Sequence, residues 1–227
     1  MSADLRLILF DVDGTLVDSQ GDIVASMTVA FDAVGHPVPD RATVLGIVGL
    51  SLDVAMARLA PELDAPAQGR MVAAYKDSYV ALRATKGAAS SPLYPGAAQV
   101  LRALAGRDDV LIGVATGKSR RGLDALLDSH GLRGVFVTEQ VADHHPSKPH
   151  PSMVLTAMDE TGVDPRDTVV VGDTVFDMQM ARAAGAHGIG VAWGYHPVDA
   201  LQEHAGQVID DFGALDVALN GIWRAGR

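Results

Sequence analysis

Two aspartates at the end of a short apolar run constrain this chain more than any other feature of its sequence. Residues 7–10, Leu-Ile-Leu-Phe, have the composition of a buried strand, and Asp11 and Asp13 follow closely. Because side chains alternate along an extended segment, the two carboxylates point the same way. Neighbouring carboxylates in apolar surroundings are costly unless a cation or a protic group lies between them. The segment therefore predicts a site for a divalent metal and a substrate, with a solvated hairpin turn as the alternative.

Composition and charge exclude several classes of protein. The chain has 227 residues, enough for one large domain or for one domain with a smaller insert. It contains no cysteine, which excludes disulfides, thiolate catalysis and cysteine-based zinc sites. Its formal net charge of -10 argues against nucleic-acid binding, and no apolar run reaches the roughly 20 residues that span a bilayer. We therefore expect a soluble, cytoplasmic protein that binds neither nucleic acid nor a membrane.

Six short apolar runs are typical of buried strands, and helical patterns lie between them. The runs consist mainly of Val, Ile and Leu without polar alternation, which indicates a parallel sheet covered on both faces. They span residues 7–10, 110–115, 135–138, 168–171, 188–192 and 207–209. Helices are predicted at 119–130, 151–161 and 177–184, each followed by a glycine. The pattern predicts a doubly wound α/β fold with a parallel sheet, in which ligands bind beyond the carboxyl ends of the strands.

Residues 16–88 interrupt this alternation. They contain helical patterns at 21–34, 51–59 and 68–84 and no strong strand. We therefore expect residues 16–88 to form a helical insert that follows the first strand. The α/β core would then comprise residues 1–15 and 89–227.

Two further segments place polar groups after predicted strands or before predicted helices. Thr116-Gly117 offers a hydroxyl and main-chain N–H groups to an anion, with simple helix capping as the alternative. Lys148 is kept out of a helical conformation by Pro149, just before the helix that starts near Pro151. A lysine in that place could neutralise a carboxylate and a phosphoryl oxygen together, and an ordinary solvated lysine is the alternative.

A final segment adds two carboxylates at the same edge of the predicted sheet. Gly172-Asp173 ends a strand, and Asp177 lies four residues later at the start of a helix. Oxygen ligands without cysteine or clustered histidine suit Mg²⁺ better than zinc, although Asp177 could also serve only as a helix cap. The adjacent His144 and His145 point apart in an extended loop and are interpreted as loop residues.

In this order the four segments resemble the motifs of the haloacid dehalogenase-like hydrolase superfamily, over nearly the whole chain. Asp11-x-Asp13-Gly14-Thr15 is similar to the first motif and Thr116-Gly117 to the second. Lys148-Pro149 is similar to the third and Gly172-Asp173-x-x-x-Asp177 to the fourth. The helical insert is similar to the small α-helical cap of phosphoglycolate phosphatase-like members. The dehalogenases that name the superfamily lack the second aspartate and use no metal, so Asp13 favours phosphoryl transfer to water.

The resemblance implies a Mg²⁺-dependent phosphatase that acts on a small phosphomonoester, with phosphoglycolate as the most natural candidate. It implies that Asp11 is the nucleophile that becomes an aspartyl phosphate and that Asp13 is the general acid and base. Thr116, the Gly117 N–H and Lys148 would hold the phosphate oxygens. The metal ligands would be Asp11, the main-chain carbonyl of Asp13, Asp173 and Asp177, the last directly or through water.

Two other functions stay open from the sequence. A sugar phosphomutase would pass the phosphoryl group to a sugar instead of water, and a non-catalytic protein would only bind phosphate. Specificity depends on the cap rather than on the fold. The cations of the insert are interpreted as solvated helix residues: Arg41, Arg58, Lys76 and Arg83. No cap residue is therefore assigned to the substrate, and the oligomeric state stays open.

Overall fold

The computed structural model describes residues 5–225, so residues 1–4 and 226–227 of the predicted core lie outside the described part of the chain. The strands are β1 (Arg6–Phe10), β2 (Val110–Thr116), β3 (Thr138–Val141), β4 (Thr168–Gly172), β5 (His187–Val191) and β6 (Gln207–Ile209). The helices are α1 (Gln20–Asp32), α2 (Arg41–Leu45), α3 (Leu52–Leu59), α4 (Ala65–Lys86), α5 (Ala97–Ala105), α6 (Arg120–His130), α7 (Ser152–Thr161), α8 (Val175–Ala183), α9 (Val198–Gln202) and α10 (Leu215–Ala225). Within the described range, none of the helices is long and apolar enough to cross a membrane.

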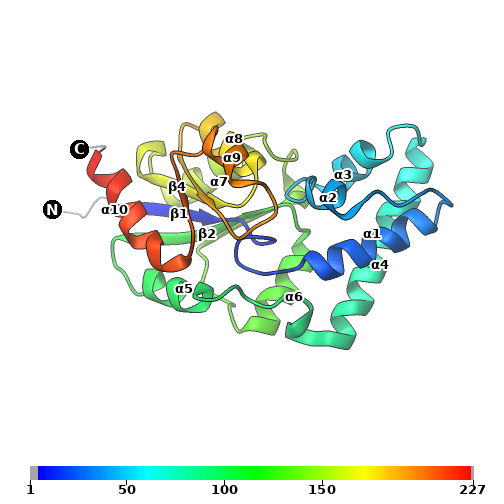
Figure 1. Ribbon diagram of the computed structural model, residues 1–227. Helices are drawn as coiled ribbons and strands as arrows, with labels where there is room; N and C mark the ends of the chain where they lie inside the picture. The colour runs from blue at the N-terminus through cyan, green and yellow to red at the C-terminus, as the bar shows by residue number, and fades with distance from the viewer. Residues whose placement is uncertain (1–4, 226–227) are drawn as a thin grey trace.

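The six strands form one parallel sheet in the order β3-β2-β1-β4-β5-β6 (Figure 1). β1 therefore lies in the middle of the sheet, between β2 and β4. Because the order reverses direction at β1, the chain ends of β1, β2 and β4 meet at a topological switch point, where open α/β sheets bind ligands. The predicted α/β fold with a doubly wound parallel sheet is confirmed.

Alternate residues of β1 pack against helices on opposite faces of the sheet. Ile8 and Phe10 are buried in one core with α5, α6 and α10. Leu7 and Leu9 are buried in a second core with α7 and α8. Both faces are thus covered, which explains why the strand sequences are apolar throughout instead of alternating with polar residues.

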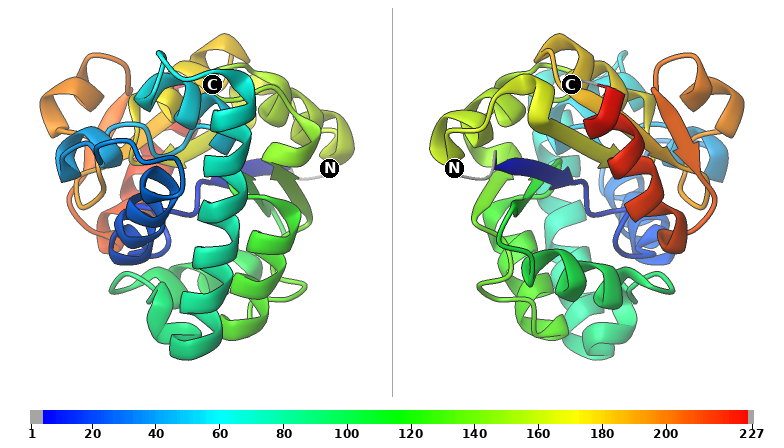
Figure 2. Two further views of the ribbon diagram at one scale, coloured as in Figure 1. Left: turned by 90° about the vertical axis from the view of Figure 1, so that its right-hand side faces the viewer. Right: turned by 90° about the vertical axis from the view of Figure 1, so that its left-hand side faces the viewer.

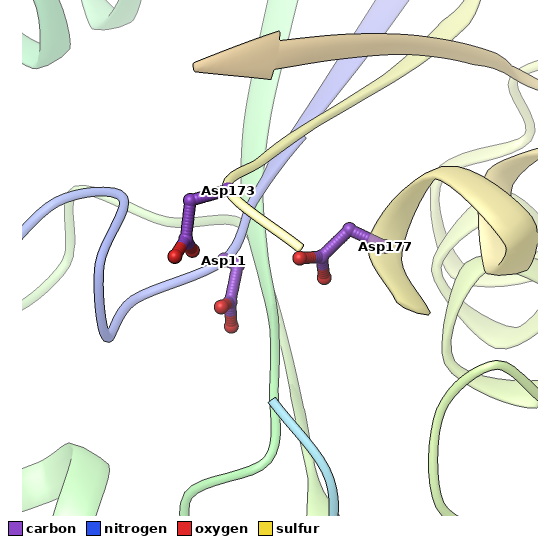
Figure 3. Close-up of side chains that lie close together, drawn as sticks. All are labelled: Asp11, Asp173 and Asp177. Carbon is purple, nitrogen blue, oxygen red and sulfur yellow. The ribbon is translucent and has the colours of Figure 1, made fainter. Parts of the chain in front are cut away.

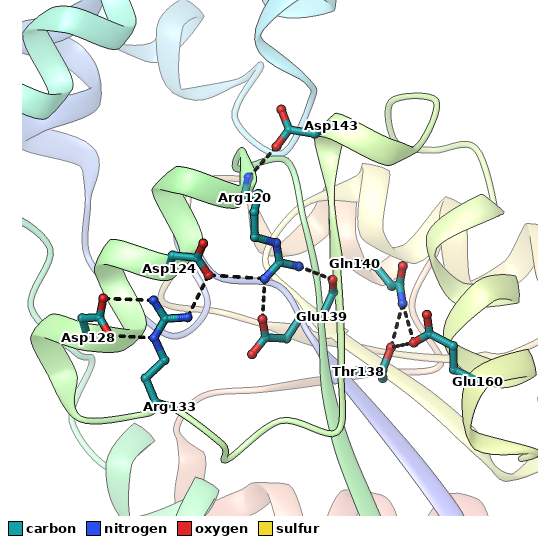
Figure 4. Close-up of polar contacts among 9 residues, drawn as sticks. All are labelled: Arg120, Asp124, Asp128, Arg133, Thr138, Glu139, Gln140, Asp143 and Glu160. Carbon is teal, nitrogen blue, oxygen red and sulfur yellow. Dashed lines mark hydrogen bonds and ion pairs between the residues drawn. The ribbon is translucent and has the colours of Figure 1, made fainter.

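The prediction for the third strand was wrong by three residues. The apolar run 135–138 was expected to be the strand, but β3 begins only at Thr138, and Val137 is 58% exposed. β3 is an edge strand, and its polar side chains have partners beside the sheet (Figure 4). Thr138 donates to Glu160 at 2.6 Å, and Glu139 pairs with Arg120. These pairs provide hydrogen-bond and ion-pair partners for the polar side chains of β3. A strand with such polar side chains cannot be distinguished from a loop by composition alone.

Helices α1 to α4, here called the helical group, stand apart from the sheet. Figure 1 shows them beyond one end of the sheet, and the left view of Figure 2 shows them in front of it. They have their own apolar core, in which Met27 and Phe31 of α1 pack with Met56 of α3 and Met71 of α4. The group thus has a separate core and lies over the end of the sheet where β1 ends.

A stability prediction follows from the close packing of β2 between its neighbours. A Cβ at Gly113 would lie 2.4 Å from Thr138 Cγ2 and 2.8 Å from Leu9 Cδ2. We expect Gly113→Ala to lower the free energy of unfolding by about 1–3 kcal/mol, as overpacking does. Gly69→Ala is the matched control, because a Cβ there meets nothing within 4 Å in α4 and should stabilise the helix by about 0.5–1 kcal/mol. Equal thermal melting curves for the two variants would contradict this account.

Candidate active site

Three buried aspartates meet at the ends of the central strands (Figure 3). Asp11 follows β1, Asp173 follows β4, and Asp177 lies in the first turn of α8. One carboxylate oxygen from each lies within 4.8 Å of the others. The structure therefore brings together carboxylates that are separated by more than 160 positions along the chain.

The Asp173 carboxylate is fixed by two parts of the chain, residues 14–15 and 194–195. Its Oδ1 accepts a hydrogen bond from Thr15 Oγ1 at 2.9 Å, and its Oδ2 accepts one from the main-chain N–H of Tyr195 at 2.9 Å. A Cβ at Gly14 would lie 2.1 Å from Asp173 Oδ2, and one at Gly194 would lie 2.0 Å from Asp173 Cβ. Gly14 also has a φ of +84°, which favours glycine. Because neither glycine has a Cβ, the Asp173 side chain fits closely between them.

Lys148 links two of the three carboxylates. Its Nζ lies 2.8 Å from Asp11 Oδ1 and 2.6 Å from Asp177 Oδ1, and its side chain is fully buried. Asp177 also caps α8, because its Oδ2 accepts hydrogen bonds from the N–H and the hydroxyl of Thr174. Asp177 therefore both caps α8 and belongs to the carboxylate cluster, as the two alternative predictions had it.

The charges in this cluster fit a divalent cation. Three carboxylates surround one ammonium group, which leaves two negative charges in a buried site. Neither oxygen of Asp11 accepts a well-aligned hydrogen bond from the described residues. Burial raises the pKa of Asp11 to about 7 despite Lys148, and burial with two neighbouring carboxylates raises the pKa of Asp173 well above its usual range. A hard divalent ion would supply both the missing charge and the missing partner for Asp11.

Asp13 lies outside this cluster and has different partners. Its Oδ1 is 2.8 Å from Lys118 Nζ and accepts a hydrogen bond from Ser19 Oγ. Lys118 Nζ also donates to the Tyr79 hydroxyl at 3.1 Å, and the neighbouring Asp13 raises the pKa of Lys118 despite burial. The side chain of Asp13 is thus held by Lys118 from the segment after β2 and by Ser19 just before α1.

Thr116 and Gly117 lie where β2 ends, close to the helical group. Thr116 is buried, and its Oγ1 accepts a hydrogen bond from the Lys118 N–H at 3.2 Å. A Cβ at Gly117 would lie 2.7 Å from the carbonyl oxygens of both Gly49 and Leu50. Only glycine allows the loop before α3 to approach this closely.

A cavity of about 620 Å³ joins these groups. Its core wall contains Asp11, Asp13, Thr116, Gly117 and Lys118, and the opposite wall is formed by α1, α3, α4 and the loop before α3. All the predicted site residues except Lys148, Asp173 and Asp177 line the cavity. Lys148 lies behind this lining, in contact with Asp11. The site is therefore a partly open cavity that lies between the sheet and the helical group.

Sequence reasoning assigned no role to Lys118, Thr15, Ser19 or Tyr195. Lys118 could have been noticed, because it follows Thr116-Gly117 and is one of only four lysines. The predicted loop role of His145 agrees with its contacts, since its ring bonds Ser152 Oγ and Gln140 Oε1 at 2.8 Å each.

Known proteins resemble this chain in sequence or in structure over most of their length. The chain is 37% identical to "Probable phosphatase IndB" of Dickeya dadantii over 90% of this chain and 89% of that protein. It is 31% identical to a phosphoglycolate phosphatase of Pseudomonas putida over 92% of this chain and 78% of that protein. The crystal structure of a hydrolase from Pseudomonas syringae superimposes with a TM-score of 0.84 at 25% identity, covering 96% of this chain and 99% of the other.

A family model provides the assignment. The model described as haloacid dehalogenase-like hydrolase matches residues 8–191, from β1 to the end of β5. This range contains all four motif segments and every carboxylate of the cluster. The chain therefore belongs to the haloacid dehalogenase-like hydrolase family.

Proposed function

We propose that this protein is a Mg²⁺-dependent phosphatase that hydrolyses a small phosphomonoester through an aspartyl phosphate on Asp11. The observation that carries the proposal is the buried cluster of Asp11, Asp173 and Asp177 beside a cavity that Thr116 and Gly117 also line. Relatives named as phosphatases support the reaction class. Phosphoglycolate is the substrate that several of those names suggest.

The metal would be held by carboxylates already in place. Asp11 and Asp173 offer oxygens directly, and Asp177 contributes directly or through water, while the main-chain carbonyl of Asp13 is a further proposed ligand. When bound, Mg²⁺ would offset the repulsion between a phosphate dianion and the carboxylate of Asp11.

The proposed reaction has two steps, and Asp13 donates a proton in the first and accepts one in the second. Asp11 attacks phosphorus, the bond from phosphorus to the ester oxygen breaks, and Asp13 gives that oxygen a proton. Asp13 then takes a proton from water as the water attacks phosphorus, which releases phosphate and restores Asp11. Thr116, the Gly117 N–H and Lys148 hold the phosphate oxygens during both steps.

The proposal assigns residues 16–88 the role of a cap over the core formed by residues 1–15 and 89–227. The helical group has a core of its own and lines the cavity wall opposite Asp11. Closure of such a cap keeps bulk water away from the aspartyl phosphate until the first step is complete. We propose a small phosphorylated metabolite as the partner and the cytoplasm as the location.

Lys118 is proposed as a positioning residue for Asp13. Lys118→Met removes the ammonium group 2.8 Å from Asp13 Oδ1, and we expect kcat to fall by about tenfold to a hundredfold, part of the roughly 10²–10⁴ that general acid–base catalysis contributes. Tyr79→Phe removes the hydroxyl that contacts Lys118 and Ser91 but keeps the contact between Lys118 and Asp13, so it should change kcat much less. Thermal melting checks that both variants fold. An unchanged kcat in Lys118→Met would show that Asp13 does not need this lysine.

A phosphate-release screen tests the function as a whole. The pure protein is assayed with a panel of small phosphomonoesters, with Mg²⁺ and with excess chelator. We expect free phosphate from at least one ester only when Mg²⁺ is present. Absence of phosphate release from every ester would contradict the proposal, and an isomerised sugar phosphate as product would indicate a phosphomutase instead.

A further inference from the structure

The cavity over Asp11 is much larger than a phosphate group and a two-carbon acid require. Its volume of about 620 Å³ lies within the range of roughly 300–1,000 Å³ that is typical of pockets for drug-sized ligands. The helical group is in contact with the core: the Ser51 N–H donates to Ser147 Oγ at 2.8 Å, and Arg83 donates to the Gly122 carbonyl at 3.0 Å. The cavity therefore has this volume while the helical group is in contact with the core.

The wall opposite Asp11 is mainly apolar. It receives side chains from α1, from the segment around the start of α3, and from α4. The apolar and aromatic side chains on this wall include Ile23, Met27, Ile47, Leu52, Tyr75 and Val80. Over most of this wall, a sugar would lose water from its hydroxyls and meet few hydrogen-bonding groups, which is unfavourable.

Two tyrosines of α4 give this wall a flat aromatic face. The rings of Tyr75 and Tyr79 are 5.9 Å apart, with 20° between their planes. The Tyr79 hydroxyl is fixed at 3.1 Å from Lys118 Nζ and 3.2 Å from Ser91 Oγ. Fixed aromatic rings favour flat, apolar ligand groups that stack or pack edge-on against them.

Most of the cations that line the cavity are already paired or hydrated, and the exception lies beside the tyrosines of α4. There are four of these cations. Lys118 is paired with Asp13. Arg83 donates to the Gly122 carbonyl through Nη1 only, and its guanidinium lies over the Tyr79 ring. Lys76 and Arg121 are exposed and so remain hydrated. Among the cations of the described lining, the buried donor without a hydrogen-bond partner is Arg83 Nη2, which belongs to the guanidinium over the Tyr79 ring.

Given the proposed phosphatase activity, we propose that the substrate is a phosphomonoester whose alcohol carries an apolar, preferably aromatic, body. The phosphate lies at Asp11 and Thr116. The body lies against α4 at Tyr75 and Val80 and against α1 at Ile23. Phosphoglycolate fills only the core end of the cavity and is a poorer substrate.

A graded series of esters tests this inference. Phosphate release with Mg²⁺ is measured for ethyl, butyl and hexyl phosphate, for phenyl phosphate and for phosphoglycolate. We expect KM to fall by about threefold to fourfold per added methylene until the cavity is filled, and kcat/KM for phenyl phosphate to exceed that for phosphoglycolate by at least about tenfold.

Variants of the apolar wall provide a second readout. Tyr75→Ala is expected to raise KM for phenyl phosphate about fivefold or more and to leave KM for ethyl phosphate nearly unchanged, while Tyr75→Phe restores the wild-type value. Val80→Ser should raise KM for hexyl phosphate. Val217→Ser is the matched control, because Val217 is an exposed helical valine outside the cavity lining.

The outcomes separate this inference from the function on which it rests. A higher kcat/KM for phosphoglycolate than for every apolar ester, or a KM that does not change with chain length, overturns the inference and leaves the phosphatase intact. Absence of phosphate release from all of these esters and from the wider panel refutes the phosphatase itself.

Discussion

Asp11→Asn is expected to lower kcat by at least about a thousandfold while the protein stays folded. An amide cannot attack phosphorus in place of a carboxylate, and loss of a nucleophile costs on this order or more. Asparagine has nearly the same shape, and Lys148 keeps its contact with Asp177 at 2.6 Å. The change also removes one of the negative charges that repel one another in the cluster, so the melting temperature without metal should not fall. Steady-state phosphate release and thermal melting measure the two effects.

The control for this variant is Asp159→Asn, the same change at an exposed position of α7. Its kcat should equal that of the wild type. Acid quenching during turnover of a ³²P-labelled ester should leave label on the wild-type protein and none on Asp11→Asn. Near-normal turnover of Asp11→Asn, or equal labelling of both proteins, would remove Asp11 from the role of nucleophile.

The sheet could be predicted because central parallel strands are buried on both faces. The interior of β1 is apolar at every position, and β2 and β4 were predicted to within about one residue at each end. β3 was misplaced because an edge strand has neighbours on one side only, so its sequence carries polar residues such as Glu139 that pair beside the sheet. The helices α2, α5, α9 and α10 were not predicted.

The candidate site was predictable only where its residues come from local motifs. Asp11, Asp173 and Asp177 each follow a strand end, so parallel topology alone brings them together. The contact of Tyr79 with Lys118, beside Asp13, was not predictable in this way, because it depends on the placement of the helical group against the core. The same is true of the apolar cavity wall, which depends on how α1 and α4 face the end of the sheet.

Removal of divalent metal is expected to abolish turnover and to lower the melting temperature. Without the ion, the charges of Asp11 and Asp173 in the cluster are only partly balanced by Lys148. Adding back Mg²⁺ at about 100 times its Kd should stabilise the fold by about 2.7 kcal/mol, or roughly 5–10 °C for a chain of this size. Chelator-treated protein is assayed for phosphate release and melted with and without Mg²⁺.

The thermal shift tests the metal site independently of catalysis. Asp173→Asn keeps an oxygen that can accept from Thr15 or from the Tyr195 N–H, but it removes a charged ligand, so the Mg²⁺ shift should shrink to a small fraction of the wild-type value. Asp159→Asn should keep the full shift, because its side chain is exposed and far from the cluster along the chain. Full turnover in excess chelator would contradict the need for a metal. An equal Mg²⁺ shift in Asp173→Asn and in the wild type would mean that the ion binds elsewhere.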